Sequence, residues 1–230
     1  MRDSSSYGTS GGVLERPIDT SMLSEAERYD LYRLLIERVG IFDTRPGHVN
    51  LIGIRGYLNG RPTENRPDRY DDTIATVFID GGRKRVEEYE STTDPGKPYT
   101  EKPLNSAGCA HLMEGRQYLY KPGKHNGRDA LVQAGPVTVW RDRDKDHARD
   151  AGELVEEGWF GINIHNGGTG EVVGEWSAGC QVIRGGEQGA AWQSFLRRVS
   201  QHPAPTLRYA LVNRTALVHA PNPRSYYPVG

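Results

Sequence analysis

Short stretches rich in β-branched and aromatic residues, separated by Gly, Pro, Asn and Asp, follow one another from Val49 onward. Val, Ile, Thr, Tyr and Phe favour pleated strands, whereas the residues between the stretches favour turns. This pattern constrains the chain to a mostly β fold. The stretches that we expect to form strands are residues 50–54, 73–79, 85–89, 130–133, 136–140, 160–164, 181–183 and 208–212.

Helical spacing of apolar residues occurs near both ends of this β region. Ser24 followed by Glu27 is a capping-box pattern, and the apolar residues after it recur at helical spacing until Gly40. A second helix is predicted within residues 187–199, where four apolar side chains share one face: Trp192, Phe195, Leu196 and Val199. The expected fold class is therefore mainly β, a β-rich α+β domain edged by an N-terminal and a late helix.

Changes of composition divide the chain into four parts. Residues 1–20 are rich in Ser, Gly and Thr and predict a flexible arm. Residues 21–45 should hold the first helix, packed on one main domain over residues 46–219. Residues 220–230 contain Pro residues that cannot continue a sheet, so we expect a tail there.

The charge balance bears on the partners of the protein. Basic and acidic residues nearly cancel, 29 against 30, which argues against a nucleic-acid partner. No apolar run is long enough to span a bilayer, and the first residues lack the apolar core of a signal peptide. We therefore expect a protein made in the cytoplasm without a membrane span, and the sequence leaves its oligomeric state open.

One cysteine and one histidine stand in a pattern that points to nucleophilic chemistry. A predicted strand carries His165, and a glycine-rich loop returns the chain to Cys180. A free thiol is only slightly ionised at neutral pH, so a neighbouring imidazole is the usual base that activates it. Gly179 leaves room for backbone N–H groups near a developing oxyanion, and we expect that role for the amides of Gly179 and Cys180.

The tetrapeptide around this cysteine occurs twice. Ser106-Ala107-Gly108-Cys109 repeats it, and His125-Asn126-Gly127 repeats the His-Asn-Gly that contains His165. The first copy lacks a preceding strand-borne histidine, so we expect Cys109 to be an inert buried thiol. We expect His111 and His125 to be packing or surface histidines rather than second bases, with a place in the lining of the cleft as the alternative.

Ile164-His165-Asn166-Gly167 and Ser177-Ala178-Gly179-Cys180 together resemble the signature of the L,D-transpeptidase catalytic domain. The resemblance implies a mixed β-sheet sandwich, Cys180 as nucleophile and His165 as base. It also implies that the Asn166 carbonyl orients the imidazole and that Ser177 braces the loop. The chain departs from the family at Ala178, where the family has histidine, and in lacking Cys-x-Arg. Around the motif, we expect four residues to contact substrate: Trp176, Gly167, Gln181 and Arg184.

The resemblance further implies a substrate and a reaction. Attack by Cys180 on a peptidoglycan stem peptide would give a thioester, which an amine resolves in cross-linking and water resolves in carboxypeptidase or endopeptidase action. The enzyme would act at the cell wall or periplasm after lysis, injection or another non-classical export. The alternative hypothesis is a non-enzymatic wall-binding module or a structural module of a phage or effector, and an unrelated cysteine peptidase is a third.

An acidic segment matches most of a calcium-loop pattern. Carboxylates occupy positions 1, 3, 5, 9 and 12 of that pattern: Asp142, Asp144, Asp146, Asp150 and Glu153. Position 6, usually glycine, is His147, and a strand-like stretch precedes the loop where the pattern has a helix. The alternative is an exposed, self-neutralising hairpin. The chemistry requires no cofactor, and a structural calcium ion is the one that the sequence suggests.

Overall fold

The computed structural model describes residues 18–218 and residue 220. The predicted arm and tail therefore fall outside the described residues, apart from residues 18–20 and 220. The helices are α1 (Glu25–Val39), α2 (Lys97–Glu101) and α3 (Ala190–Ser200), with 3-10 turns η1 (Thr20–Met22), η2 (Gly174–Trp176) and η3 (Arg214–Leu217). The strands are β1 (Val49–Arg55), β2 (Tyr57–Leu58), β3 (Arg61–Pro62), β4 (Asp72–Asp80), β5 (Arg83–Thr92), β6 (Cys109–Leu112), β7 (Arg116–His125), β8 (Arg128–Gln133), β9 (Val137–Asp142), β10 (Val155–Gly158), β11 (Ile164–Asn166), β12 (Gln181–Ile183) and β13 (Leu207–Asn213).

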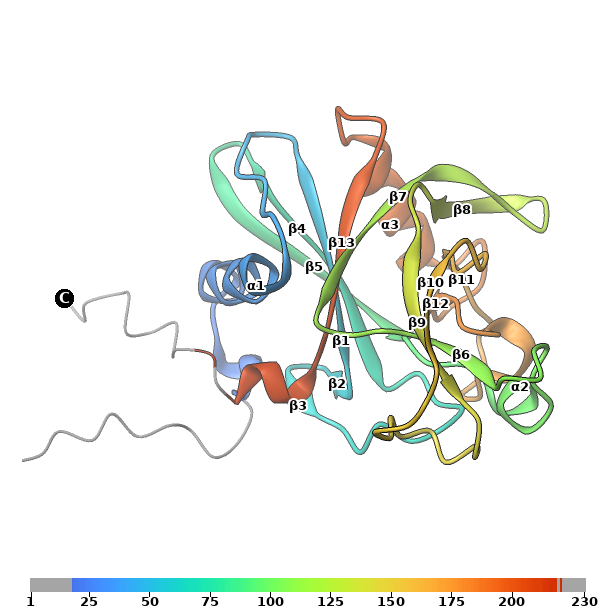
Figure 1. The fold of residues 1–230 in the computed structure, drawn as a ribbon. Helices are drawn as coiled ribbons and strands as arrows, with labels where there is room; N and C mark the ends of the chain where they lie inside the picture. The colour runs from blue at the N-terminus through green and yellow to red at the C-terminus, as the bar shows by residue number, and fades with distance from the viewer. Residues whose placement is uncertain (1–17, 219, 221–230) are drawn as a thin grey trace, which may run out of the picture.

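Eight strands close into a barrel in the order β1-β13-β7-β8-β11-β12-β5-β4 (Figure 1). The pairs β1–β13 and β11–β12 are parallel and the other pairs of the barrel are antiparallel, so the sheet is mixed. The mainly β prediction is confirmed. The sheet is a closed barrel rather than the expected sandwich, because β1 pairs with both β4 and β13 and leaves no open edge.

A separate sheet with the order β10-β9-β6 lies beside the barrel. Strands β9 and β10 form a hairpin around the acidic loop, and β6 pairs with β9 on its other edge. The small sheet brings the first cysteine, Cys109, and the acidic loop to one side of the barrel.

Among the described residues, no helix has the length and apolar character needed to cross a membrane.

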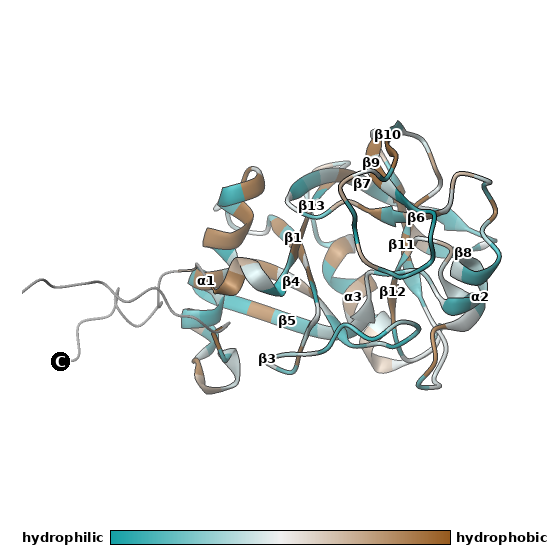
Figure 2. Cartoon of the chain, turned by 60° about the horizontal axis from the view of Figure 1, so that its bottom comes forward, coloured by the Kyte–Doolittle hydropathy of each residue, from teal (hydrophilic) through white to brown (hydrophobic). Residues whose placement is uncertain are grey.

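Helix α1 begins and ends where the sequence predicts. The Ser24 hydroxyl accepts the Glu27 amide, the Glu27 carboxylate accepts the Ser24 amide at 2.7 Å, and the Gly40 amide donates to the Ile36 carbonyl. The helix buries Tyr32 and other apolar side chains against β4 and β5 (Figures 1 and 2). The late helix, α3, is also present and packs into the core of the barrel.

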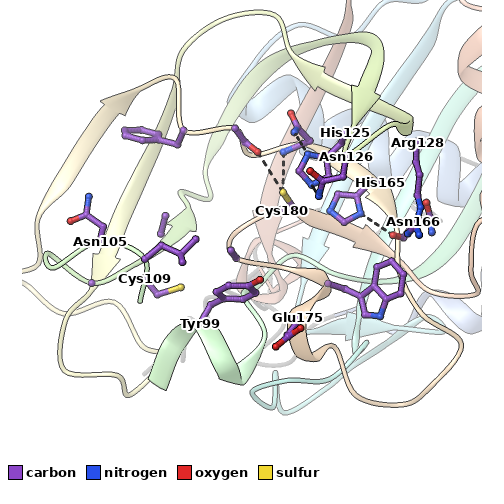
Figure 3. A pocket seen from close by; sticks show the side chains of 18 of the residues that line it. Tyr99, Asn105, Cys109, His125, Asn126, Arg128, His165, Asn166, Glu175 and Cys180 are labelled. Carbon is purple, nitrogen blue, oxygen red and sulfur yellow. Dashed lines mark hydrogen bonds between the residues drawn. The ribbon is translucent and has the colours of Figure 1, made fainter. Parts of the chain in front are cut away.

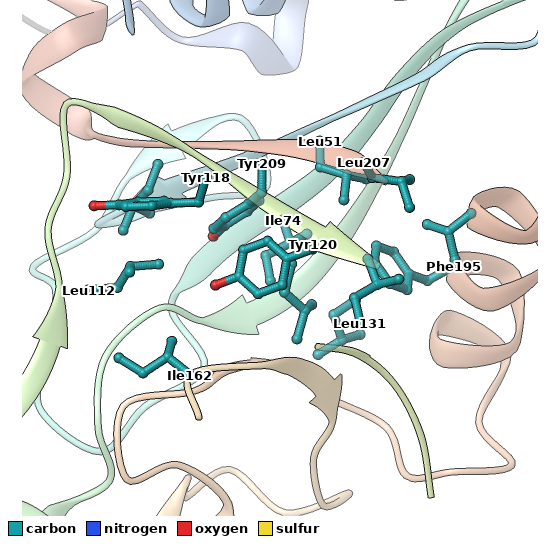
Figure 4. Packing of buried hydrophobic residues seen from close by; sticks show 14 of the residues in the cluster. Leu51, Ile74, Leu112, Tyr118, Tyr120, Leu131, Ile162, Phe195, Leu207 and Tyr209 are labelled. Atoms are coloured by element: carbon teal, nitrogen blue, oxygen red, sulfur yellow. The ribbon is translucent and has the colours of Figure 1, made fainter. Parts of the chain in front are cut away.

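Strand β1 is buried along its whole length because the protein covers both of its faces. Leu51 points into the barrel core, whereas Ile52 and Ile54 belong to the cluster beneath α1. Successive side chains of a strand face opposite sides, so a strand covered on both faces buries side chains on each of them. The barrel core itself contains aromatic residues such as Tyr120, Tyr209 and Phe195 (Figure 4).

The predicted strand at residues 160–164 forms only in its last residue, where β11 begins. The Gln133 side chain accepts the amides of Phe160 and Ile162, at 3.2 and 2.9 Å, in place of a neighbouring strand. Gly161 between them has a positive φ of 73°, which interrupts an extended chain. This irregular segment forms part of the pocket described next.

Candidate active site

Cys180 and His165 lie on neighbouring elements of the barrel and line one pocket of about 820 Å³. His165 is the middle residue of β11, and Cys180 directly precedes the parallel neighbour β12. The Cys180 Sγ atom and ring nitrogens of His165 and His125 lie within 4.8 Å of one another. Figure 3 shows these three side chains converging at the pocket.

The His165 ring is fixed by its neighbour. Its Nδ1 lies 2.8 Å from the Asn166 carbonyl oxygen, the contact that the resemblance implies. A carbonyl only accepts hydrogen bonds, so Nδ1 carries the proton and Nε2 presents its lone pair. Nε2 is buried and has no hydrogen-bond partner among the described residues. Burial lowers the pKa of His165 to about 4, so the imidazole is neutral at pH 7.

Cys180 is a protonated thiol at rest. Its Sγ accepts a hydrogen bond from the backbone amide of Asn163 at 3.4 Å. It also lies 3.5 Å from the Gly161 carbonyl oxygen, to which the thiol can donate. Burial raises the pKa of the thiol to about 11, although the Asn163 amide opposes the shift. The site therefore holds a thiol beside a neutral imidazole, and its proton would leave during attack rather than before it.

Ser177 ties the cysteine loop together. Its hydroxyl donates to the Cys180 carbonyl at 2.8 Å and accepts the Gly179 amide at 3.2 Å. We expected the backbone amides of Gly179 and Cys180 to bind an oxyanion. Because the Gly179 amide already donates to Ser177, the Cys180 amide is the one of the two that can take this role. Ser177 thus lies where the resemblance places a bracing residue.

Gly179 owes its position to backbone packing. Its φ is 129°, and a Cβ atom there would lie 2.6 Å from the Ala110 carbonyl oxygen of β6. The sequence suggested that the missing side chain leaves room for backbone N–H groups near the oxyanion. The structure gives a different reason, because glycine lets the cysteine loop approach β6.

The repeated tetrapeptide reaches the same pocket from β6. Gly108 also has a positive φ, of 118°, and a Cβ there would overlap the Asp142 carbonyl of β9. Cys109 lines the pocket, but it is not part of the cluster of ring nitrogens and sulfur that contains Cys180. Burial and the neighbouring Asp142 raise the pKa of Cys109 to about 12. In both copies the glycine before the cysteine has a positive φ, and among the described residues only Cys180 belongs to a cluster with two histidines.

His125 lies in the site, although the sequence favoured a packing or surface position for it. Its ring stacks on His165 with centroids 4.7 Å apart, and its Nδ1 lies 3.0 Å from the Asn163 side-chain amide. Burial lowers its pKa. The repeated His-Asn-Gly was the available signal, but Asn126 and Gly127 have positive φ values of 50° and 80° and form the turn between β7 and β8. Asn-Gly is typical of a hairpin turn, so the motif by itself did not indicate a functional role for the histidine before it.

Trp176 and Asn166 line the pocket, as does Arg128, whose guanidinium lies 5.7 Å from the centroid of the Trp176 ring. Glu175 adds a carboxylate to the same wall. The pocket therefore combines an aromatic surface with two arginines, Arg128 and Arg141, and one carboxylate, Glu175.

Three residues expected to contact substrate are engaged elsewhere. Arg184 pairs with Glu90 of β5 at 2.6 Å, and the fully buried Gln181 accepts the Tyr209 hydroxyl at 2.9 Å inside the barrel. The Gly167 amide donates to the carbonyl at the end of β12. These three residues are outside the pocket lining. Side chains alternate along a strand, so the residue after Cys180 points away from it.

The acidic loop forms a β-hairpin in which the carboxylates gather. Side chains of Asp144, Asp146 and Asp150 are exposed and offer oxygens within 4.8 Å of one another, and Asp142, Asp144 and Glu153 form an overlapping group. Asp142 differs from the rest because it is fully buried and accepts the amides of its own loop. Calcium binding by this loop stays a prediction.

Two chemistries suit the cluster around Cys180. A thiol and an imidazole with a free lone pair can perform nucleophilic catalysis, and a thiolate with two imidazoles can ligate zinc.

Comparison of the chain with protein-family models, curated proteins and solved structures finds no match in any of the three. The site is therefore interpreted from its geometry and from the motif resemblance alone.

Proposed function

We propose that the protein is a cysteine acyl-transfer enzyme with Cys180 as nucleophile and His165 as general base. The observation that carries the proposal is the lone pair of His165 Nε2. It is buried, unpartnered among residues 18–218 and 220, and fixed in its tautomer by the Asn166 carbonyl, while a ring nitrogen of His165 lies within 4.8 Å of the thiol sulfur. Catalytic hydrogen bonds are often longer before substrate binds.

The reaction runs in two halves. Sγ of Cys180 forms a bond to an amide carbonyl carbon while His165 Nε2 takes the thiol proton, and the carbonyl oxygen becomes an oxyanion near the Cys180 amide. The C–N bond then breaks, and the imidazolium returns the proton to the leaving amine. The resulting thioester is attacked by an acceptor amine or by water, which passes a proton to His165 Nε2. The C–S bond then breaks, the acyl product leaves, and the imidazolium returns the proton to Sγ of Cys180.

The substrate that we propose is a stem peptide of peptidoglycan, which follows from the L,D-transpeptidase resemblance. The walls of the pocket support a zwitterionic peptide, because the Arg128 guanidinium suits a carboxylate and Glu175 suits an ammonium group. Trp176, beside the Arg128 guanidinium, offers an apolar face for the peptide chain. An amine acceptor gives a cross-link, and water gives a trimmed or cleaved stem.

Incubation with defined muropeptides followed by mass spectrometry tests the proposal. The wild-type protein and Cys109→Ala should both yield new masses from cross-linking, loss of a terminal residue or stem cleavage, and Cys180→Ala should yield none. Cys109→Ala is the matched control, because it removes the other thiol of the same pocket and of the same tetrapeptide. Equal product formation by Cys180→Ala would overturn the assignment.

A zinc ion held by the cluster of Cys180, His165 and His125 is the second candidate, favoured by the mutual proximity of their ligand atoms. The same preparations discriminate between the two. A metal content that falls by one equivalent in Cys180→Ala, with no product in the wild type, would support the metal site and refute the nucleophile.

A further inference from the structure

A second group of histidines lies beside the pocket, where β6 meets the acidic loop. His111 of β6 is fully buried, and its Nε2 has no hydrogen-bond partner among the described residues. His147 in the loop also has a buried ring nitrogen, Nδ1, without a hydrogen-bond partner in the described part of the chain. Buried polar atoms in folded proteins nearly always have partners, so two orphans close together need an explanation.

These two rings and one carboxylate converge. One ligand atom from each of His111, Asp142 and His147 lies within 4.8 Å of the other two. The two imidazole rings meet edge to face, with centroids 6.2 Å apart and planes at 82°. Asp142 is itself fully buried, and its Oδ2 lies 3.6 Å from His111 Nε2, beyond normal hydrogen-bond distance.

We propose that His111, Asp142 and His147 bind a divalent first-row transition metal, for which zinc is the best fit. Two imidazole nitrogens and one carboxylate oxygen are a ligand set that zinc accepts, with a water molecule completing the tetrahedron. Tetrahedral bonds of about 2 Å separate the ligand atoms by roughly 3.3 Å. The three side chains need only draw together around the ion.

The surroundings of His111 support this assignment. Its other nitrogen, Nδ1, lies 3.1 Å from the Asp94 carboxylate, which in turn pairs with Arg55 at 3.1 Å. A metal-binding histidine commonly donates its second N–H to a carboxylate, which leaves the lone pair directed at the metal. Trp140 stacks on the ring with centroids 4.0 Å apart and holds its plane. The histidine is therefore fixed in the orientation that a metal ligand requires.

The site borders the cysteine loop. His111 follows Ala110, whose carbonyl packs against Gly179, and Asp142 ends the neighbouring strand β9. A bound ion would tie the loop after β9 to β6 and hold the strand on which the Cys180 loop rests. This metal site depends on none of the chemistry proposed for Cys180.

Metal titration of the full-length protein, stripped with chelator, tests the inference. Calorimetry with zinc chloride should show one equivalent bound, and the melting temperature should rise. His147→Gly should weaken zinc binding by at least tenfold, because it removes a ligand while glycine tolerates the positive φ of 64° at this position. Asp150→Asn, in the same loop but outside the site, is the matched control and should bind zinc as the wild type does.

Each other result has a definite meaning. No heat and no thermal shift with zinc would overturn the proposal and leave His111 as a buried imidazolium between Asp94 and Asp142. Zinc binding that survives in His147→Gly but is lost in Cys180→Ala would place the ion at the other cluster. The protein could instead bind calcium and not zinc, more tightly in His147→Gly and not at all in Asp150→Asn. That result would make the loop a calcium site and would also overturn the proposal.

Discussion

Alkylation of Cys180 across a range of pH tests the resting state of the site. Burial raises the pKa of this thiol from 9.0 to about 11, which lowers the thiolate fraction at pH 7 by about 100-fold. A thiolate of higher pKa is also a stronger nucleophile, and a Brønsted coefficient of about 0.45 recovers roughly eightfold. We therefore expect iodoacetamide to react with Cys180 about tenfold more slowly than with a free thiol at pH 7, before any steric protection.

The assay uses the Cys109→Ala variant, so that Cys180 is the sole cysteine, and follows carbamidomethylation by mass spectrometry between pH 6 and 10. The rate should climb about tenfold per pH unit through pH 9, whereas a short cysteine peptide should level off near its own pKa. A rate that levels off below pH 8 would refute the reasoning. It would mean that the site holds a thiolate and an imidazolium at rest.

Three further predictions concern the same site. Gly179→Ala should lower the free energy of unfolding by about 1–3 kcal/mol in chemical denaturation, because this position combines a positive φ with close contact to the Ala110 carbonyl. The control Gly152→Ala, at a position open to solvent, should lower it by under about 0.5 kcal/mol. Equal losses in the two variants would contradict the packing argument. The pH profile of kcat/KM should lose activity on the acid side near pH 4, where His165 becomes protonated and can no longer accept a proton; a limb near pH 6.5 would show that burial does not depress its pKa. His125→Ala should reduce kcat about tenfold with little change in KM, because the stacked ring holds His165 in place; an unchanged kcat would make His125 a bystander.

Local signals predicted much of the fold. The capping box of Ser24 and Glu27 set the start of α1, and Gly40 set its end. The closed barrel was beyond such signals, since it depends on β1 pairing with β13, more than 150 residues away in the sequence. No periodicity within a strand states which distant strand it will join.

The candidate site shows the same division. His165 and Cys180 could be linked from the sequence because one glycine-rich loop, residues 167–180, joins two adjacent strands, β11 and β12. His125 reaches them through the β7–β8 hairpin, a tertiary contact that spacing does not reveal. Gln181 was placed at the substrate from its closeness to Cys180, although neighbouring residues of an extended chain face opposite sides.

The acid–base roles depended on burial, which the sequence does not state. The motif alone suggested a readily ionised thiol. The structure encloses both Cys180 and His165, and burial keeps each of them neutral. The same enclosure leaves the Nε2 lone pair of His165 without a competing partner in the described structure.

Trapping of the acyl-enzyme tests the central claim most directly. The wild-type protein is mixed with a tetrapeptide-stem muropeptide, quenched in acid, and analysed by intact-protein and peptide mass spectrometry. We expect an added mass equal to the acyl fragment, located on the peptide that contains Cys180 and released by hydroxylamine as a thioester. An unmodified Cys180 in a preparation that converts the substrate, or an adduct on Cys109 instead, would contradict it.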